Sequence, residues 1–269
     1  MVEFREPPPS GVELAWRLGG IRVRIAPSFF LVYGIIIALI AWNRMGNDPV
    51  ALALAVALDL ACIFVAILFV SYVQAIVYRS YGLRATIVVR EFMSGVYPSA
   101  SPPTALQRIA VNLAYPAGCF LLYILLRYTD DVYHWKQTSL LAAVMYLILT
   151  NIALFWAVIG LLPILPYAGG KVILEVFTLL SPRNGMAMAL VVSIITGLAY
   201  IAYAVAVHFG YMREQVVFGQ EIYASVIVAV FFVLSVMQNW QALQAIRAMR
   251  RGYQDPIDDY DDDRSPWER

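Results

Sequence analysis

The sequence predicts an all-α polytopic membrane protein with about six transmembrane helices, a small β-hairpin at the membrane surface and a re-entrant Pro/Gly loop. Composition gives the first indication, because the 269 residues are 61% hydrophobic and 14% charged, with a mean hydropathy of +0.71. Soluble domains are nearer 45–50% apolar and about 25% charged. The second indication is the recurrence of apolar runs long enough to cross about 30 Å of hydrocarbon, which takes about 20 helical residues.

The apolar runs define the predicted spans, at residues 27–43, 50–79, 105–127, 138–161, 186–209 and 221–245. The second run is long enough to extend about 45 Å as a helix, so we expect it to tilt or to project beyond the bilayer near Gln74. Before the first run, residues 1–26 contain Pro7-Pro8-Pro9, which excludes a helix there. Alternation over residues 22–25 favours a short strand. We therefore expect residues 1–26 to form a cytoplasmic segment on the membrane surface.

Two further segments have their own patterns. Residues 83–101 are rich in β-forming side chains and are closed by prolines, which predicts the surface hairpin. In the chain after Gly252, apolar residues do not recur at a helical or strand spacing, and the aspartates there are typical of a solvated acidic tail. We thus expect three parts: the segment 1–26, a transmembrane domain over 27–245 and a disordered cytoplasmic tail over 246–269. The tail aspartates are Asp255, Asp258, Asp259, Asp261, Asp262 and Asp263.

Charge distribution predicts the topology. With the N-terminus inside, only four of the 19 Lys and Arg residues lie outside. Both termini are therefore expected in the cytoplasm, and we expect an integral protein of the bacterial inner membrane, with the lipid bilayer as its partner. A net charge of +1, without a cluster of Lys and Arg along the sequence, argues against nucleic acid as a partner. Cys62 and Cys119 lie inside apolar runs, which favours buried hydrophobic roles for both.

The end of the second apolar run carries the most specific motif. There Ala75 is followed by Arg79, Tyr81 and Gly82. This stretch resembles the zinc-binding helix of the site-2 protease family of intramembrane metalloproteases, in which His-Glu-x-x-His-Ala is followed by Arg-x-Tyr-Gly. Val70 and Gln74 occupy the positions of the two His, and Ser71 occupies that of the Glu. The residues that frame these positions match the family: Ala75, Arg79, Tyr81 and Gly82.

A second stretch, residues 160–171, is similar to the family's Asn-x-x-Pro-x-x-Pro-x-Asp-Gly-Gly motif, whose Asp is the third zinc ligand. Gly160 replaces the Asn and Ala168 replaces the Asp. Weaker similarities at residues 20–28, 94–96 and 114–116 extend the resemblance over about residues 19–185. The residues that match the second motif are Pro163, Pro166, Gly169 and Gly170.

The replaced residues determine the expected chemistry. Two His four residues apart on a helix hold one zinc ion, and the Glu acts as general base on the bound water. Zinc would be the family's cofactor, but this chain offers an alkyl group, a hydroxyl, a carboxamide and a methyl. We therefore predict no metal, no cofactor and no catalytic residue. His134 and His208 fall near predicted outer loops, away from these positions. The positions concerned are Val70, Ser71, Gln74 and Ala168.

Three functions remain open. The first is a catalytically inactive site-2 protease homologue that binds transmembrane segments of client proteins, because the family's loop and hairpin hold an extended segment. The second is an active metalloendopeptidase with unrecognised ligands. The third is an ion or small-solute transporter that uses Asp59, since a carboxyl group inside a span costs about 2.5–3.5 kcal/mol and marks function. Ser71 lacks the nearby His or Lys that a serine nucleophile needs. For the first function, the expected substrate-binding residues are Gly95, Pro163, Pro166, Gly169 and Gly170.

Overall fold

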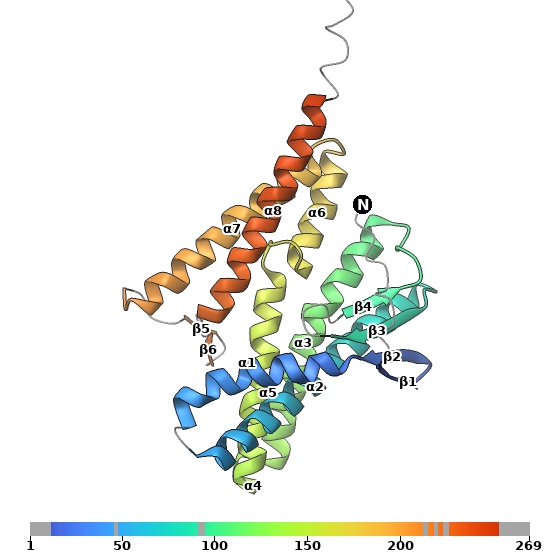
Figure 1. Cartoon of the computed structure of the whole chain (residues 1–269). Coiled ribbons are helices and arrows are strands. Elements are labelled where there is room, and N and C mark those ends of the chain that lie inside the picture. Colours follow the sequence, from blue (N-terminus) through green and yellow to red (C-terminus); the bar gives the residue numbers. More distant parts are fainter. Residues whose placement is uncertain are drawn as a thin grey trace, which may run out of the picture. The chain divides into compact units, whose positions relative to one another are not determined.

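The computed structural model describes residues 12–45, 48–90, 95–211, 215–217, 220–222 and 226–252 (Figure 1). The chain forms two compact units, Met1–Leu162 and Pro163–Arg269, called here the N-terminal and C-terminal units. The N-terminal unit contains β1 (Leu14–Leu18), β2 (Ile21–Ile25), α1 (Pro27–Met45), α2 (Pro49–Ser80), β3 (Ala85–Val89), β4 (Gly95–Pro98), α3 (Ala105–Tyr133), α4 (Trp135–Thr138) and α5 (Leu140–Leu161). The C-terminal unit contains α6 (Ala168–Leu180), α7 (Gly185–His208), β5 (Gln215–Val217), β6 (Gln220–Ile222) and α8 (Val226–Gly252).

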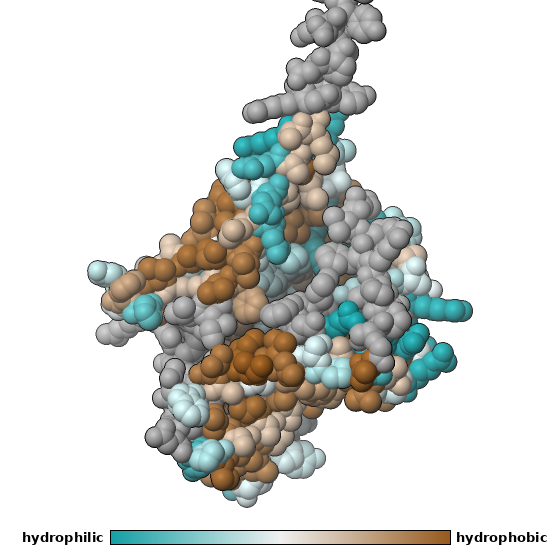
Figure 2. Space-filling view, in the orientation of Figure 1, coloured by the Kyte–Doolittle hydropathy of each residue, from teal (hydrophilic) through white to brown (hydrophobic). Residues whose placement is uncertain are grey.

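The helices confirm a polytopic helical membrane protein. Among the helices that the structure describes, five are long and apolar enough to cross a membrane: α2, α3, α5, α7 and the stretch Ala229–Met249 of α8. The apolar part of α1, Pro27–Leu39, is shorter. Large apolar side chains are exposed along these helices, such as Leu140 at 83% and Leu106 at 76%. Apolar residues likewise cover α1 and α7 on the face shown in Figure 2. Such exposure is expected where the surroundings are lipid rather than water.

The last predicted span needs a correction at each end. Its expected start at residue 221 falls in β6, and α8 begins only at Val226. At the other end, α8 continues to Gly252, so residues 246–252 are helical rather than part of a disordered tail. The rest of the predicted tail, residues 253–269, and Pro7-Pro8-Pro9 lie outside the described residues. The cytoplasmic location of residues 1–26 and of the chain after Gly252 stays a prediction.

A four-stranded sheet, with the order β1-β2-β3-β4, joins the N-terminal segment to the end of α2. The hairpin predicted over residues 83–101 is present as β3 and β4, which pair antiparallel, and its turn residues 91–94 lie outside the described residues. The sequence did not predict β1, which pairs antiparallel with β2. The pairing of β2 with β3 is parallel. The predicted hairpin is therefore half of a larger sheet.

One face of the sheet packs against the helices. Ile21, Val23 and Ile25 of β2 form a buried cluster with Phe29 of α1 and Ala75 of α2. Burial of this kind contributes about 25 cal/mol per Å² of apolar surface that leaves water, so it fixes the sheet on the last turns of α2. The end of α2 is thus held between a sheet and a helix bundle.

On its other face the sheet carries a buried ion-pair network. The carboxylate of Glu13 accepts a hydrogen bond from Arg24 Nε at 2.8 Å and one from Arg90 Nη2 at 2.9 Å. The Glu13 side chain is 6% exposed and that of Arg24 is 4% exposed. Three strands are connected in this way, because Glu13 precedes β1, Arg24 lies in β2 and Arg90 follows β3.

Local signals define the main helices of the N-terminal unit. Asp48 caps α2 by accepting hydrogen bonds from the backbone N–H groups of Val50 and Ala51, with a proline at the first helical position. Thr104 and Gln107 form a capping box at the start of α3. α2, α3 and α5 then share a buried core that includes Ala66, Leu122, Tyr123, Ala153 and Leu154.

In the C-terminal unit, α7 packs on both α6 and α8. Tyr200 of α7 stacks on Phe232 of α8, with ring centroids 4.1 Å apart and an interplanar angle of 22°. Such offset stacking contributes about 0.5–1.5 kcal/mol beyond the area that it buries. The short antiparallel pair β5 and β6 connects α7 to α8.

Candidate functional site

The residues that frame the first motif form the joint between α2 and the sheet. Gly82 has φ +77°, a left-handed conformation that glycine adopts without the steric cost of a Cβ atom. Its N–H donates to the carbonyl of Arg79 at 2.9 Å, and the N–H of Leu83 donates to that of Tyr78 at 3.1 Å. These two bonds form a Schellman motif, which ends the helix.

Ala75 and Arg79 connect the same helix end to the sheet. Ala75 is fully buried in the cluster beneath β2 and β3. The guanidinium of Arg79 donates to the carbonyl of Gly19, in the turn between β1 and β2, at 2.6 Å. Ala75, Arg79 and Gly82 therefore have structural roles that need no metal.

The positions of the expected ligands are closely packed. Val70 is 3% exposed and clusters with Cys119 of α3 and Ala157 of α5. α3 approaches closely here because Gly118 faces α2, and a Cβ atom at Gly118 would lie 3.4 Å from a methyl group of Val70. Ser71 is 2% exposed. The first His position and the Glu position of the family are thus part of a helix interface.

Gln74 bonds to the neighbouring helix. Its side-chain Nε2 donates to the backbone carbonyl of Val111 in α3 at 3.1 Å. Interhelical hydrogen bonds of this kind stabilise membrane bundles by about 0.6 kcal/mol on average and by up to about 1.7 kcal/mol. The side chain at the second His position therefore stabilises the packing of α2 on α3.

These side chains do not fit zinc. A catalytic zinc site needs about three nitrogen, sulfur or carboxylate ligands. Val70 has no donor atom, and the side-chain amide of Gln74 is hydrogen-bonded to the backbone carbonyl of Val111. Among the described residues, no three His, Cys, Asp or Glu side chains are grouped so that they could hold a metal. Whether the protein binds zinc stays a prediction to be tested by metal analysis.

An apolar pocket opens next to Val70. Its walls come from α2, α3 and α5, all within the N-terminal unit, and it encloses about 290 Å³ of empty space that includes its open side. Trp156 lies at this pocket and is 36% exposed. The space free inside the pocket itself is about 20 Å³, which holds a group of about the size of a water molecule or a methyl group. The lining comprises Ile63, Ala66, Ile67, Val70, Tyr115, Cys119, Leu122, Ile152, Ala153 and Trp156.

The predicted re-entrant loop lies in the C-terminal unit. Residues 162–167 connect α5 to α6 without helical structure, and the peptide bond before Pro166 is cis. Two side chains from the last two spans hold this loop at Leu165. Ser193 Oγ in α7 accepts from the Leu165 N–H at 3.0 Å, and Asn239 Nδ2 in α8 donates to the Leu165 carbonyl at 3.0 Å. Both backbone polar groups of Leu165 are therefore satisfied by side chains.

The glycines of the second motif are not in the turn. We expected Gly169 and Gly170 to form it, but both are buried in the first turn of α6, which begins at Ala168. A Cβ atom at Gly170 would collide with the backbone of Ile164 and Leu165. The physical reason for this glycine is therefore the close approach of the loop to the helix.

The remaining expected substrate-binding residues also have definite places. Pro163 is the second residue of the loop and Pro166 is its cis proline. Gly95 is the first residue of β4, an edge strand of the sheet. A Cβ atom at Gly95 would meet nothing within 4 Å, so the space beside it is open. Gly95 belongs to the N-terminal unit, whereas the loop belongs to the C-terminal unit.

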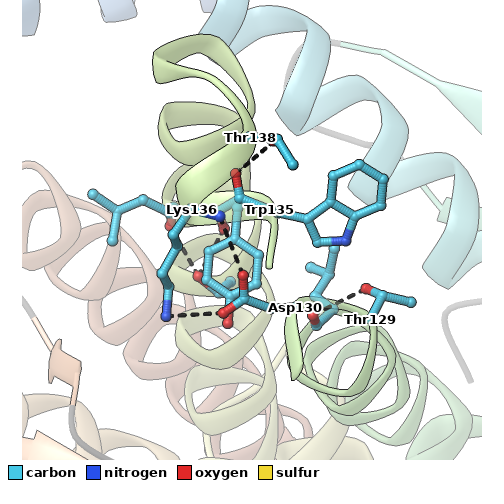
Figure 3. Close-up of polar contacts among 9 residues, drawn as sticks. Thr129, Asp130, Trp135, Lys136 and Thr138 are labelled. Atoms are coloured by element: carbon cyan, nitrogen blue, oxygen red, sulfur yellow. Dashed lines mark hydrogen bonds and ion pairs between the residues drawn. The ribbon is translucent and has the colours of Figure 1, made fainter. Parts of the chain in front are cut away.

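The two histidines occupy helix ends. His134 joins α3 to α4 in a left-handed conformation with φ 51° and is exposed. Beside it, the carboxylate of Asp130 accepts from the backbone N–H of Lys136 at 3.3 Å and pairs with its ammonium at 3.1 Å (Figure 3). The same ammonium lies 4.7 Å from the centroid of the Tyr146 ring. His208 is the last residue of α7 and is exposed.

Several polar residues with definite roles were not identified from the sequence. Ser193 and Asn239 are single polar residues in apolar helices, and this isolation is the signal that could have pointed to them. The Glu13 network could not have been found, because its members are separated by up to 77 positions in the chain. Asp59 lies half-buried in α2 and makes an interaction of its own.

Comparisons with known proteins support the fold. The sequence matches no family model and no curated protein. Among solved structures, the chain is similar to the site-2 protease from Methanocaldococcus jannaschii, with a TM-score of 0.51 and 14% identity, over 86% of this chain and 95% of that chain. The likeness confirms, at the level of the fold, the resemblance that the two motifs indicated.

Proposed function

We propose that this site-2-protease-like membrane protein is catalytically inactive and binds transmembrane segments of client proteins. The observation that carries the proposal is the packing at the ligand positions, where Val70 fills a helix interface and Gln74 bonds to a backbone carbonyl. General-base catalysis alone is worth about 10²- to 10⁴-fold in rate, and here the Lewis acid would be missing as well. The scaffold retains its fold without these groups.

Two features support binding. The first is the apolar pocket beside Val70, which is lined by three membrane-spanning helices and has room for a small apolar group of a client at its open side. The second is the edge strand β4, since an exposed edge pairs with an extended chain through main-chain hydrogen bonds and needs no metal.

Metal analysis tests the inactive state. We expect the wild-type protein, purified without chelators, to contain far less than one zinc per chain and to leave a model membrane substrate intact. Stoichiometric zinc in the wild type would instead favour the active metalloendopeptidase with unrecognised ligands. A gain-of-binding variant provides the positive control, because it restores the family's ligands and general base: Val70→His, Ser71→Glu, Gln74→His and Ala168→Asp.

Binding is tested with a labelled single-span peptide in bicelles, read by energy transfer to the labelled protein. Val70→Phe should fill the pocket and weaken binding by about tenfold, which corresponds to about 1.4 kcal/mol. The matched control is Val65→Phe, because Val65 lies on the same helix and is 53% exposed. Equal binding by both variants, or none by the wild type, would contradict the proposal.

A further inference from the structure

We propose that the sheet end beside the C-terminus of α2 binds the phosphate groups of acidic phospholipids. Four arginines that are far apart in the sequence meet at this sheet end, and all four are exposed. Together they are called the arginine cluster. Its members are Arg17, Arg22, Arg79 and Arg84.

Two of the arginines face each other across neighbouring strands. Arg17 of β1 and Arg22 of β2 are register partners, so their side chains leave the same face of the sheet. Cβ atoms of such partners lie about 4.5–5.5 Å apart, and like charges at this separation destabilise a sheet. An anion bound between the two guanidinium groups would remove this repulsion.

The other two arginines lie at the same end of the sheet. Arg79 reaches the turn between β1 and β2 through its bond to the carbonyl of Gly19. Arg84 directly precedes β3, which runs parallel to β2, so the starts of both strands lie at one edge. The helix end and the sheet thus bring four positive charges to one place.

At the opposite end of the sheet, two arginines are neutralised by a carboxylate of the protein itself. There Glu13 binds Arg24 and Arg90 with both carboxylate oxygens. In the described part of the chain, no member of the arginine cluster forms an ion pair with a carboxylate. Among the described residues, the charge of the cluster is therefore not balanced by a carboxylate.

Neighbouring apolar residues identify that partner as lipid. Leu14, Trp16 and Leu18 of β1 are 63%, 39% and 55% exposed, and they share the sheet face that packs on the helices. The carbonyl of Leu18 lies 3.5 Å from the hydroxyl of Tyr72 on α2, so this apolar edge lies along the last turns of a membrane-spanning helix. An element with one apolar face and one cationic face at this depth lies in the membrane interface.

Phosphate is the anionic group at that depth. The guanidinium group matches phosphate oxygens with two parallel hydrogen bonds, and each arginine near an anionic membrane surface strengthens binding by about fivefold. Free phosphate and the protein's own acidic stretch after Gly252 carry the same charge. A phospholipid accounts for both features, because its phosphate matches the arginines and its acyl chains match the exposed apolar residues of β1.

The test uses the full chain in a neutral detergent, titrated with phosphatidylglycerol, phosphatidylcholine or inorganic phosphate and read by native mass spectrometry. We expect phosphatidylglycerol to bind most tightly. Arg22→Gln should weaken this binding by about fivefold, and Arg17→Gln with Arg22→Gln by about 25-fold. The matched control is Arg127→Gln, which removes an exposed arginine of α3 outside the cluster and should change the affinity by less than about twofold. Thermal unfolding of each variant establishes that it is folded.

Three results would overturn the proposal. Equal affinity for phosphatidylglycerol and phosphatidylcholine would show that charge is not recognised. Displacement of the lipid by an equal concentration of inorganic phosphate would indicate a free-phosphate site. Loss of the arginine effect after Asp261, Asp262 and Asp263 are changed to Asn would identify the partner as the acidic stretch of the chain itself.

Discussion

The loop between α5 and α6 should lose stability when either of its side-chain partners is removed. Ser193→Ala leaves the Leu165 N–H without its acceptor, and Asn239→Leu leaves the Leu165 carbonyl without its donor. An unsatisfied buried polar group costs about 1–3 kcal/mol. Because Leu165 itself is half-buried, we expect the lower part of this range, about 1–2 kcal/mol for each variant.

The double variant should cost less than the sum of the two single variants. Once one bond is lost, the loop can relax and satisfy part of the remaining group, and residues that share a partner show coupling energies of about 0.5–3 kcal/mol. The free energy of unfolding is measured in mixed micelles by denaturant titration. Hydrogen exchange provides a local measurement, since a loss of about 1–2 kcal/mol accelerates exchange of the Leu165 amide by about 5- to 30-fold.

Thr150→Val is the matched control for this experiment. Thr150 is fully buried like Ser193, but its hydroxyl donates to carbonyls of its own helix, those of Tyr146 and Leu147. Those carbonyls also accept bonds within the helix, so the expected cost is below about 0.5 kcal/mol. If Ser193→Ala and Asn239→Leu cost no more than Thr150→Val, the last two spans do not hold the loop and the reasoning fails.

Three further predictions concern the N-terminal unit. Glu13→Gln should destabilise the protein by about 3–5 kcal/mol in denaturant titration, because it leaves the buried Arg24 without its partner; a change below about 1 kcal/mol would show that the network is not needed. Burial raises the pKa of Tyr97, and the charge of Arg90 partly offsets this effect. The stabilising contribution of the neutral Tyr97 hydroxyl should therefore be complete below about pH 10 and be lost as the pH rises through the raised pKa. Tyr97→Phe should lack this alkaline loss, and an identical alkaline profile would contradict the assignment. Gly118→Leu should cost at least about 1–3 kcal/mol in thermal unfolding, since α2 leaves no room for a larger side chain, and unchanged stability would show that the two helices separate easily.

Residues that resemble a catalytic motif can be retained for structural reasons alone. Gly82 ends α2 and Arg79 connects the helix to the sheet, and neither role involves a metal. Gly170 allows the loop to contact α6, a steric requirement that is independent of the residue at position 168. A motif whose frame is present and whose ligands are absent therefore indicates the fold more strongly than the reaction.

Much of the fold follows from local properties of the sequence. Hydrophobicity over about 20 residues predicts a span wherever it occurs, so α2, α5 and α7 were placed within two residues of their observed ends, whereas α3 continues to Tyr133, beyond the predicted end at residue 127. The replacement of the family's metal ligands was equally evident from the sequence, because whether a side chain can donate electrons to a metal is a property of the residue itself. Val70 and Ala168 lack such atoms in any fold.

Only the tertiary structure decided which distant residues meet. The parallel pairing of β2 with β3 joins segments about 60 residues apart, and it alone brings Arg22 and Arg84 to one edge. Ser193 and Asn239 gained roles only because α7 and α8 pack beside the same loop. Such contacts depend on how whole elements pack, and no short window of sequence contains both partners. The sequence alone thus determined the spans and the missing ligands, whereas packing determined the loop support, the buried ion-pair network and the arginine cluster.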